Sequence, residues 1–138
     1  MKLSTHLNFN GNCRAAFEYY EKHLGGKITF IMTYGESPMA DHVAPESHGR
    51  IVHATLELPG NQRVSGADMP AGRPFDKPQG FEVLLTLEDP ADAERIFAAL
   101  ADEGETQMPL QKTFWSERFG MLTDRFGTPW MVNCRGLV

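Results

Sequence analysis

Alternation of apolar and polar residues opens the chain and predicts a half-buried β-strand over residues 3–10. Leu7 and Phe9 fall on one face, and His6 and Asn8 fall on the other. Similar or β-branched patterns predict further strands over 27–34, 50–58 and 62–68.

Helical spacing follows the first strand. Asn12 is a good N-cap, and Gly25-Gly26 stops the predicted helix. The buried stripe of this helix would consist of Cys13, Ala16, Phe17, Tyr20 and Leu24.

The same order of patterns then repeats. The pattern of residues 81–87 predicts a strand. Asp89 and Pro90 predict the start of a helix, and Gly104 predicts its end. Further strand-like pieces occur at 106–111, 112–119, 120–123 and 130–134. The chain is therefore expected to be α+β, with two βαβββ modules, 1–72 and 78–138, in one domain.

The residues 69–80 are rich in Pro and Gly and form the expected linker between the modules. Asn12 and Asp89 play equivalent parts in the two predicted helices. One extra residue between Asn8 and Gly11 would place His6 opposite Glu82 in the two first strands.

A tight turn precedes the last strand. Asp124 opens it, and Gly127 supplies a position that tolerates positive φ. Pro129 cannot donate a ladder hydrogen bond, so it is expected at the start of the returning strand. The side chains of Trp130 and Met131 should then point to opposite faces of the sheet.

Composition limits the class of protein. The 138 residues are 41% hydrophobic and 22% charged, with a net charge of −5, as in a soluble globular domain. The chain shows no basic stripe for nucleic acid, no membrane span and no signal-peptide pattern, so a cytoplasmic protein is expected. Cys13 and Cys134 lie outside any CxxC pair, which argues against a disulfide framework or a structural zinc site.

Several strings, taken in order, resemble the vicinal oxygen chelate superfamily, the glyoxalase/bleomycin-resistance/dioxygenase group, and within it the PhnB-like branch. The resemblance covers nearly the whole chain. It rests on Leu7-Asn-Phe-Asn-Gly-Asn12, Ala16-Phe-Glu-Tyr-Tyr20, Ile51-Val-His53-Ala-Thr-Leu56, Gly66-Ala-Asp68, Phe119-Gly-Met-Leu-Thr-Asp124 and Asp124-Arg-Phe-Gly127-Thr-Pro-Trp130.

The resemblance implies that each module curls into a half-barrel and that paired modules, often in a homodimer, enclose a cavity for a small molecule. Many members bind one divalent metal (Zn, Mn, Ni or Fe) there, through residues of the first and last strands of each module. The branch also has a label as a ubiquinone-related methyltransferase. The chain has no glycine-rich strand-to-helix loop that would support that activity.

Carried over by position, the resemblance implies metal ligation by His6, Glu82 and Asp68. The fourth strand has Ser65 where a carboxylate is expected, and the last strand has Met131 where a Glu is expected. A conventional glyoxalase I site is therefore not expected. His6 could equally be a polar cavity residue bonded to a neighbour.

Two residues are candidates for catalysis. His53 would act as a general base or a substrate contact, against the alternative of a structural histidine bonded across strands. Glu82 lies on an otherwise apolar strand and is either paired, shifted in pKa or turned to solvent. The candidate ligand-binding residues are Asn8, Trp115, Arg118, Met131 and Asn133.

Three functions remain open at this stage. The first is a metal-assisted lyase, isomerase or dioxygenase. The second is a metal-free protein that binds a drug or metabolite, as resistance proteins of the superfamily do. The third is a vestigial structural dimer. Losses at the expected ligand positions favour the second.

Overall fold

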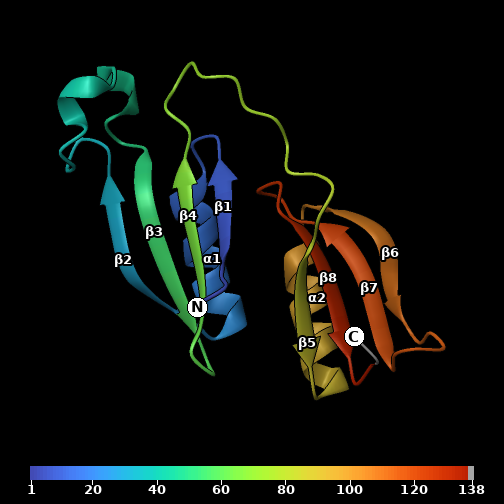
Figure 1. Cartoon of the computed structure of the whole chain (residues 1–138). Helices are drawn as coiled ribbons and strands as arrows, with labels where there is room; N and C mark the ends of the chain where they lie inside the picture. Colours follow the sequence, from blue (N-terminus) through green and yellow to red (C-terminus); the bar gives the residue numbers. More distant parts are fainter. Residues whose placement is uncertain (137–138) are drawn as a thin grey trace. The chain divides into compact units, whose positions relative to one another are not determined.

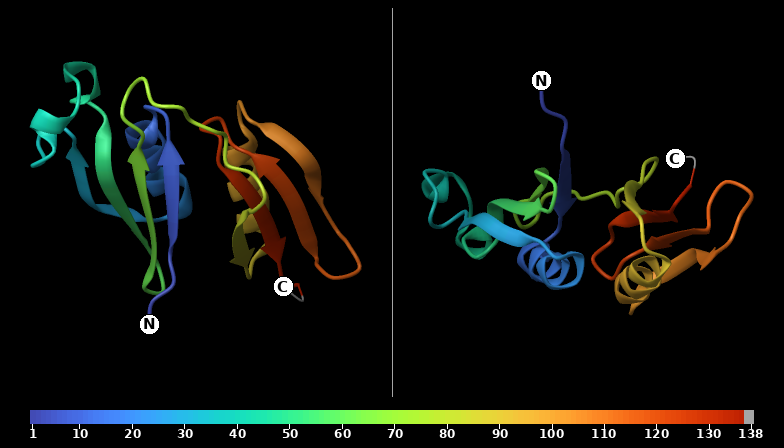
Figure 2. Two further views of the ribbon diagram at one scale, coloured as in Figure 1. Left: turned by 45° about the horizontal axis from the view of Figure 1, so that its top comes forward. Right: turned by 90° about the horizontal axis from the view of Figure 1, so that it is seen from below.

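The computed structural model describes residues 1–136, and its contacts divide the chain into two compact units. Unit 1 spans Met1–Asp76, and unit 2 begins at Lys77. Each unit has a four-stranded sheet with one helix packed on it (Figures 1 and 2). The expected α+β fold of two βαβββ modules is therefore confirmed.

In unit 1 the strand order is β1-β4-β3-β2, with β1 parallel to β4 and the other pairs antiparallel. Helix α1 covers one face of this sheet (Figure 2). The elements are β1 (Thr5–Phe9), α1 (Cys13–Leu24), β2 (Lys27–Thr33), β3 (Ile51–Leu58) and β4 (Gln62–Asp68). The connection between β2 and β3 contains two short 3-10 helices, η1 (Ala40–His42) and η2 (Pro45–Ser47).

Unit 2 repeats this plan with the order β5-β8-β7-β6, again with one parallel pair, β5 and β8. Helix α2 packs on one face of the sheet. The elements are β5 (Val83–Leu87), α2 (Pro90–Ala101), β6 (Glu105–Gln111), β7 (Arg118–Thr123) and β8 (Pro129–Cys134).

Close packing of each helix on its sheet depends on a glycine. A Cβ at Gly66 of β4 would lie 2.6 Å from the Phe17 ring of α1, and a Cβ at Gly120 of β7 would lie 2.6 Å from the Phe97 ring of α2. These glycines therefore face the helices. Because side chains alternate along a strand, Ser65 and Met121 face away from them. We call these outer surfaces the helix-free faces.

The turn before β8 forms as predicted. Asp124 accepts hydrogen bonds from the backbone N–H groups of Phe126 and Thr128 and from the Trp130 indole, and Gly127 has a φ of 94°. Pro129 begins β8. The carboxylate thus fixes both the turn and the buried Trp130 ring.

Two predicted boundaries in unit 2 were wrong. Residues 112–117 form a loop rather than a strand, since the Thr113 N–H donates to the Ser116 carbonyl oxygen across a local turn. Helix α2 ends at Ala101, and the left-handed residue is Glu103, with a φ of 58°. Gly104 is instead required by close approach, because a Cβ there would collide with the Thr123 carbonyl oxygen.

Candidate functional site

The helix-free face of unit 1 gathers polar and aromatic side chains in one row across the sheet. His6 is opposite Ser65, Ser65 is opposite Thr55, and Thr55 is opposite Phe30. A register shift in β2 between Ile28 and Phe30 sets the last pairing. Strands β1, β4, β3 and β2 thus each contribute one residue to the row.

His53, two residues before Thr55 on β3 and opposite Met32, adds a second imidazole beside this row. Its ring lies 5.9 Å from the His6 ring, stacked at 23°, and 6.0 Å from the Phe30 ring. The Thr55 hydroxyl lies 3.3 Å from His53 Nε2. We call the group His6, Phe30, His53, Thr55 and Ser65 the imidazole face.

His6 is held in place by Ser65. The distance from His6 Nδ1 to Ser65 Oγ is 2.8 Å, so the Nε2 atom is the ring nitrogen left to meet a ligand. Although His6 is an exposed residue, partial loss of hydration of its ring, and then the positive charge that His53 can carry, lower the pKa of His6 below 6.5. The His6 ring is therefore neutral at physiological pH, when it can donate from one nitrogen and accept at the other.

Asp68, a predicted metal ligand, has a structural position at the end of β4. It is buried, and its Oδ1 accepts from the N–H groups of Gly11 (2.8 Å) and Cys13 (3.0 Å), while its Oδ2 accepts from the Ile51 N–H (2.9 Å). Both carboxylate oxygens are thus used to join β1, α1 and β3. This geometry gives no support to metal ligation by Asp68.

The same contacts correct the expected start of α1. Asn12 is at the N-cap position, but its side chain makes no capping hydrogen bond, because its φ of −112° and ψ of 20° are not those of an extended cap. The Asp68 carboxylate from β4 accepts the Cys13 N–H instead. The Cys13 thiol is fully buried, and burial followed by the Asp68 charge raises its pKa to about 12, so it is an inert thiol.

Equivalent hydrogen bonds show how the first strands of the two units correspond. The Phe9 carbonyl accepts the Met69 N–H in unit 1, and the Leu87 carbonyl accepts the Arg135 N–H in unit 2. The residue equivalent to His6 is therefore Leu84, and the predicted register that matched His6 with Glu82 was wrong. Glu82 precedes β5, which begins only at Val83.

The helix-free face of unit 2 is apolar in the corresponding row. Leu84 is opposite Met131, Met131 is opposite Met121, and Met121 is opposite Met108. Leu84 is 43% exposed. We call these four residues the thioether face.

These registers test whether the residues fit the divalent metal that the fold family implies. The positions on the first and last strands are His6 and Ser65 in unit 1, and Leu84 and Met131 in unit 2. Only His6 is a strong ligand for a divalent ion, since a hydroxyl and a thioether bind weakly and Leu84 has no donor atom. Within residues 1–136, no three His, Cys, Asp or Glu side chains are grouped to hold a metal ion. The donor set does not fit a conventional chelate site.

The predicted ligand-binding residues have different surroundings. Asn8 lies on the helix-free face of β1, exposed and opposite Ala67. Met131 belongs to the thioether face, whereas Asn133 is fully buried. Arg118 bonds to Glu94 of α2 (3.3 Å) and thus lies on the helix side.

Trp115 covers the same end of the sheet as Asn133. Its ring packs edge-on against Phe119 at 5.3 Å, and Phe119 is the register partner of Asn133. The Ser116 hydroxyl anchors the loop at the carbonyl oxygens of Arg118 (2.6 Å) and Cys134 (2.9 Å). Trp115 thus contributes to packing beneath this loop.

Sequence patterns alone did not indicate Phe30 and Thr55 as partners of the histidines. Their place follows from the β2 register shift and from the antiparallel pairing of β3 with β4. The parallel pairing of β1 with β4 also joins His6 to Ser65 across 59 positions. Only a signal that reported strand register could have found this row.

Residues 5–132 match the Glyoxalase/Bleomycin resistance protein/Dioxygenase superfamily. The chain belongs to this superfamily. Its members bind small molecules, often dimerise and often use a divalent metal. None of the helices in the described part of this member is long and apolar enough to cross a membrane.

Related proteins match this chain along almost its whole length. Protein YjdN of Escherichia coli (strain K12) is 33% identical, with 96% of this chain and 95% of YjdN covered. The crystal structure of protein PA1353 from Pseudomonas aeruginosa is 41% identical, with 97% of each chain covered and a TM-score of 0.89. A Bacillus cereus structure described as a putative 3-demethylubiquinone-9 3-methyltransferase, PhnB protein, is 27% identical, with 97% and 99% covered and a TM-score of 0.82.

Proposed function

We propose that this protein binds a small, flat organic molecule on the imidazole face, through hydrogen bonds and ring stacking rather than a conventional metal chelate. The observation that supports this is the contrast between the two units. Unit 1 has a hydrogen-bonded His6–Ser65 pair beside the His53 ring, whereas the equivalent positions of unit 2 are Leu84 and Met131.

The chemistry of the imidazole face suits such a ligand. Phe30 is 44% exposed and, with His53, offers ring surface for stacking. The Nε2 atom of His6 can exchange a hydrogen bond with a carbonyl, phenol or carboxylate group on the ligand. Asn8 extends the polar surface along β1.

A second candidate function is metal-independent acid–base catalysis, such as a lyase or isomerase reaction. The observation that favours it is the proximity of a second imidazole, His53, to a His6 ring of lowered pKa. A neutral imidazole at this position would accept a proton from a bound substrate. His6 would then be the general base, and His53, which the sequence predicts to be a general base or a substrate contact, would have the second of these roles.

We also propose that the protein is a homodimer. In the described residues each sheet is open, with β1 and β2 at the edges of one and β5 and β6 at the edges of the other. Unpaired strand edges favour burial against a second copy. Light scattering coupled to size-exclusion chromatography would give twice the chain mass of 15.4 kDa.

NMR titration with two simple probes, benzoate and phenol, tests the binding proposal. We expect backbone shifts in β1, β3 and β4 of unit 1. His6→Ala or His53→Ala should weaken binding by about tenfold, the effect of losing one good hydrogen bond or ring contact. His42→Ala, which removes an exposed imidazole of η1, is the matched control and should change nothing.

Metal analysis of untagged protein, purified without chelator, tests the alternative of a metal chelate. One divalent metal per chain that disappears in His6→Ala would overturn the proposed binding mode. Probe shifts that leave β1, β3 and β4 unaffected would overturn the location. Turnover of a carbonyl substrate that depends on His53 would favour the second candidate.

A further inference from the structure

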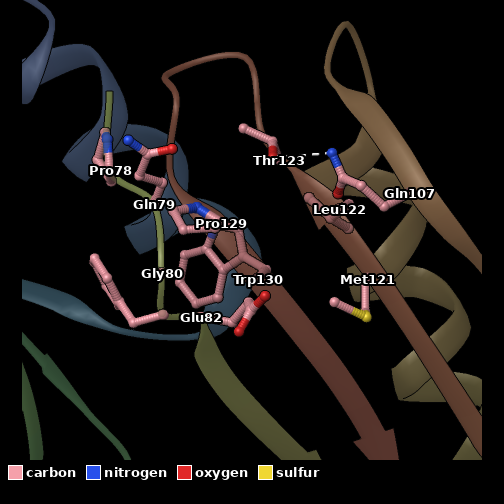
Figure 3. Close-up of a pocket in the computed structure, with 11 residues that line it drawn as sticks. Pro78, Gln79, Gly80, Glu82, Gln107, Met121, Leu122, Thr123, Pro129 and Trp130 are labelled. Atoms are coloured by element: carbon pink, nitrogen blue, oxygen red, sulfur yellow. Dashed lines mark hydrogen bonds between the residues drawn. The ribbon is translucent and has the colours of Figure 1, made fainter. Parts of the chain in front are cut away.

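Unit 2 has a pocket of its own beside the start of β5. It is lined by segment 78–82, by Gln107 of β6, by Met121 and Thr123 of β7, and by Pro129 and Trp130 of β8 (Figure 3). Its volume is about 200 Å³. All of these residues belong to unit 2, so the pocket is complete within one compact unit.

Among the residues that the structure describes, Glu82 is the only charged one that lines this pocket. It is exposed, and among the described residues it takes part in no ion pair. Glu105, the register neighbour of Thr123, adds a second carboxylate at this end of the sheet. The pocket therefore has negative charge with no basic lining residue to balance it.

A hydrogen-bond acceptor comes from β6, which also lines the pocket. The Gln107 side-chain nitrogen donates to Thr123 Oγ1 at 3.1 Å. In Figure 3 this nitrogen points to Thr123, and the amide oxygen is turned away from it. This bond uses one N–H of the amide and fixes the orientation of the group, so the amide oxygen is placed to accept a hydrogen bond from a ligand while the second N–H remains a donor.

The remaining wall is apolar. Met121, Pro129 and Phe81 line it, and Phe81 is 45% exposed. A cavity of about 150 Å³ can hold one benzene molecule, so this pocket has room for a benzene-sized body with a short chain. An exposed aromatic ring beside a carboxylate is also a favourable environment for a cation.

We propose that this pocket binds an organic monocation, a primary ammonium group on a small apolar or aryl body. The ammonium pairs with the Glu82 carboxylate and donates a second hydrogen bond to the Gln107 amide oxygen. Phe81, Met121 and Pro129 contact the apolar body. This site is separate from the imidazole face of unit 1, so either proposal can fail without the other.

Isothermal titration calorimetry and NMR with 2-phenylethylammonium, and with the uncharged 2-phenylethanol as matched probe, test this site at neutral pH. We expect the ammonium to shift residues 78–82, Gln107 and 121–130, and to bind at least about tenfold more tightly than the alcohol. Glu82→Gln should remove that advantage by weakening ammonium binding about tenfold. Gln107→Leu should weaken it by a smaller factor.

Glu46→Gln in η2 makes the same change of charge at a residue that does not line the pocket, and it should leave binding unchanged. Equal affinity for the ammonium and the alcohol would overturn the proposal. So would equal loss of ammonium binding in Glu46→Gln and Glu82→Gln, since this would indicate general attraction to a protein of net charge −5. Ammonium shifts confined to unit 1 would likewise overturn it.

Discussion

The two units share a fold but differ at equivalent positions on their helix-free faces. The row in unit 1 consists of hydroxyl, imidazole and phenyl groups, whereas the row in unit 2 consists of Leu84 and three methionines. In both units the row crosses one parallel pair of strands and two antiparallel pairs. The difference teaches that the fold fixes where a face lies, while its chemistry depends on a few outward residues that contribute little to packing.

The units also differ in how a buried carboxylate stabilises them. Asp68 joins β1, α1 and β3 of unit 1 through three backbone N–H groups. Asp124 fixes a local turn and one indole of unit 2. The first carboxylate connects segments far apart in sequence, and the second organises seven neighbouring residues, Asp124 to Trp130.

The largest expected effect is that of Asp68→Asn. The change leaves the shape but replaces a charged acceptor by an amide, so unit 1 should lose about 3 kcal/mol of unfolding free energy. Urea unfolding and amide hydrogen exchange would measure it. Asp41→Asn, an exposed change in η1, is the control. Equal loss of exchange protection in both units would contradict the division into separately stabilised units.

The two units also differ in how their helices are capped, and the expected effect on the unfolding free energy is of intermediate size. The Asp89 side chain accepts the Ala91 N–H at 3.0 Å, so Asp89→Ala should cost about 1 kcal/mol. Asn12 makes no such bond, and Asn12→Ala should cost less than about 0.5 kcal/mol. Thermal or urea unfolding of the two variants would measure the difference. Equal costs would show that Asp68 does not replace the local cap of α1.

The smallest expected effect is the pH dependence caused by His6. Because the folded pKa of His6 is lowered below 6.5, the unfolded chain takes up a proton more readily than the folded one as pH falls. The contribution of His6 to stability is therefore complete above pH 6.5 and declines as pH falls through that value toward the folded pKa. Unfolding measured across this range would show the decline.

The interaction between the two histidines can be separated from burial. His53→Asn removes the nearby positive charge but leaves burial, so the pKa of His6 should rise toward 6.5 without reaching it. NMR titration of the His6 ring protons would report this, with His42→Asn as the control. An unchanged His6 pKa in His53→Asn would show that the two rings do not interact electrostatically.

The sequence by itself determined the elements and their repetition. The period of apolar residues marked β1, α1, β5 and α2, and Asp89, Gly25 and Gly127 marked helix and turn ends, because these signals act over a few neighbouring residues. The resemblance carried by ordered strings was also sufficient to indicate the superfamily. Local signals were misleading at Asn12 and Gly104, where a distant carboxylate and a distant carbonyl decide the geometry.

Only the tertiary structure decided which residues share a site. The sequence matched His6 with Glu82, whereas the strand ladders match it with Leu84, because the length of each strand-to-helix connection sets the correspondence. Asp68 has a carboxylate of the kind that binds metal ions, but in the structure this carboxylate accepts hydrogen bonds from backbone N–H groups and so joins separate segments of the chain. Side chains on a strand alternate every residue, so a small error in register moves a residue to another row or another face. The row that contains His6 depends on the pairing of β1 with β4, whose paired residues are 59 positions apart, and no local pattern in the sequence records that pairing.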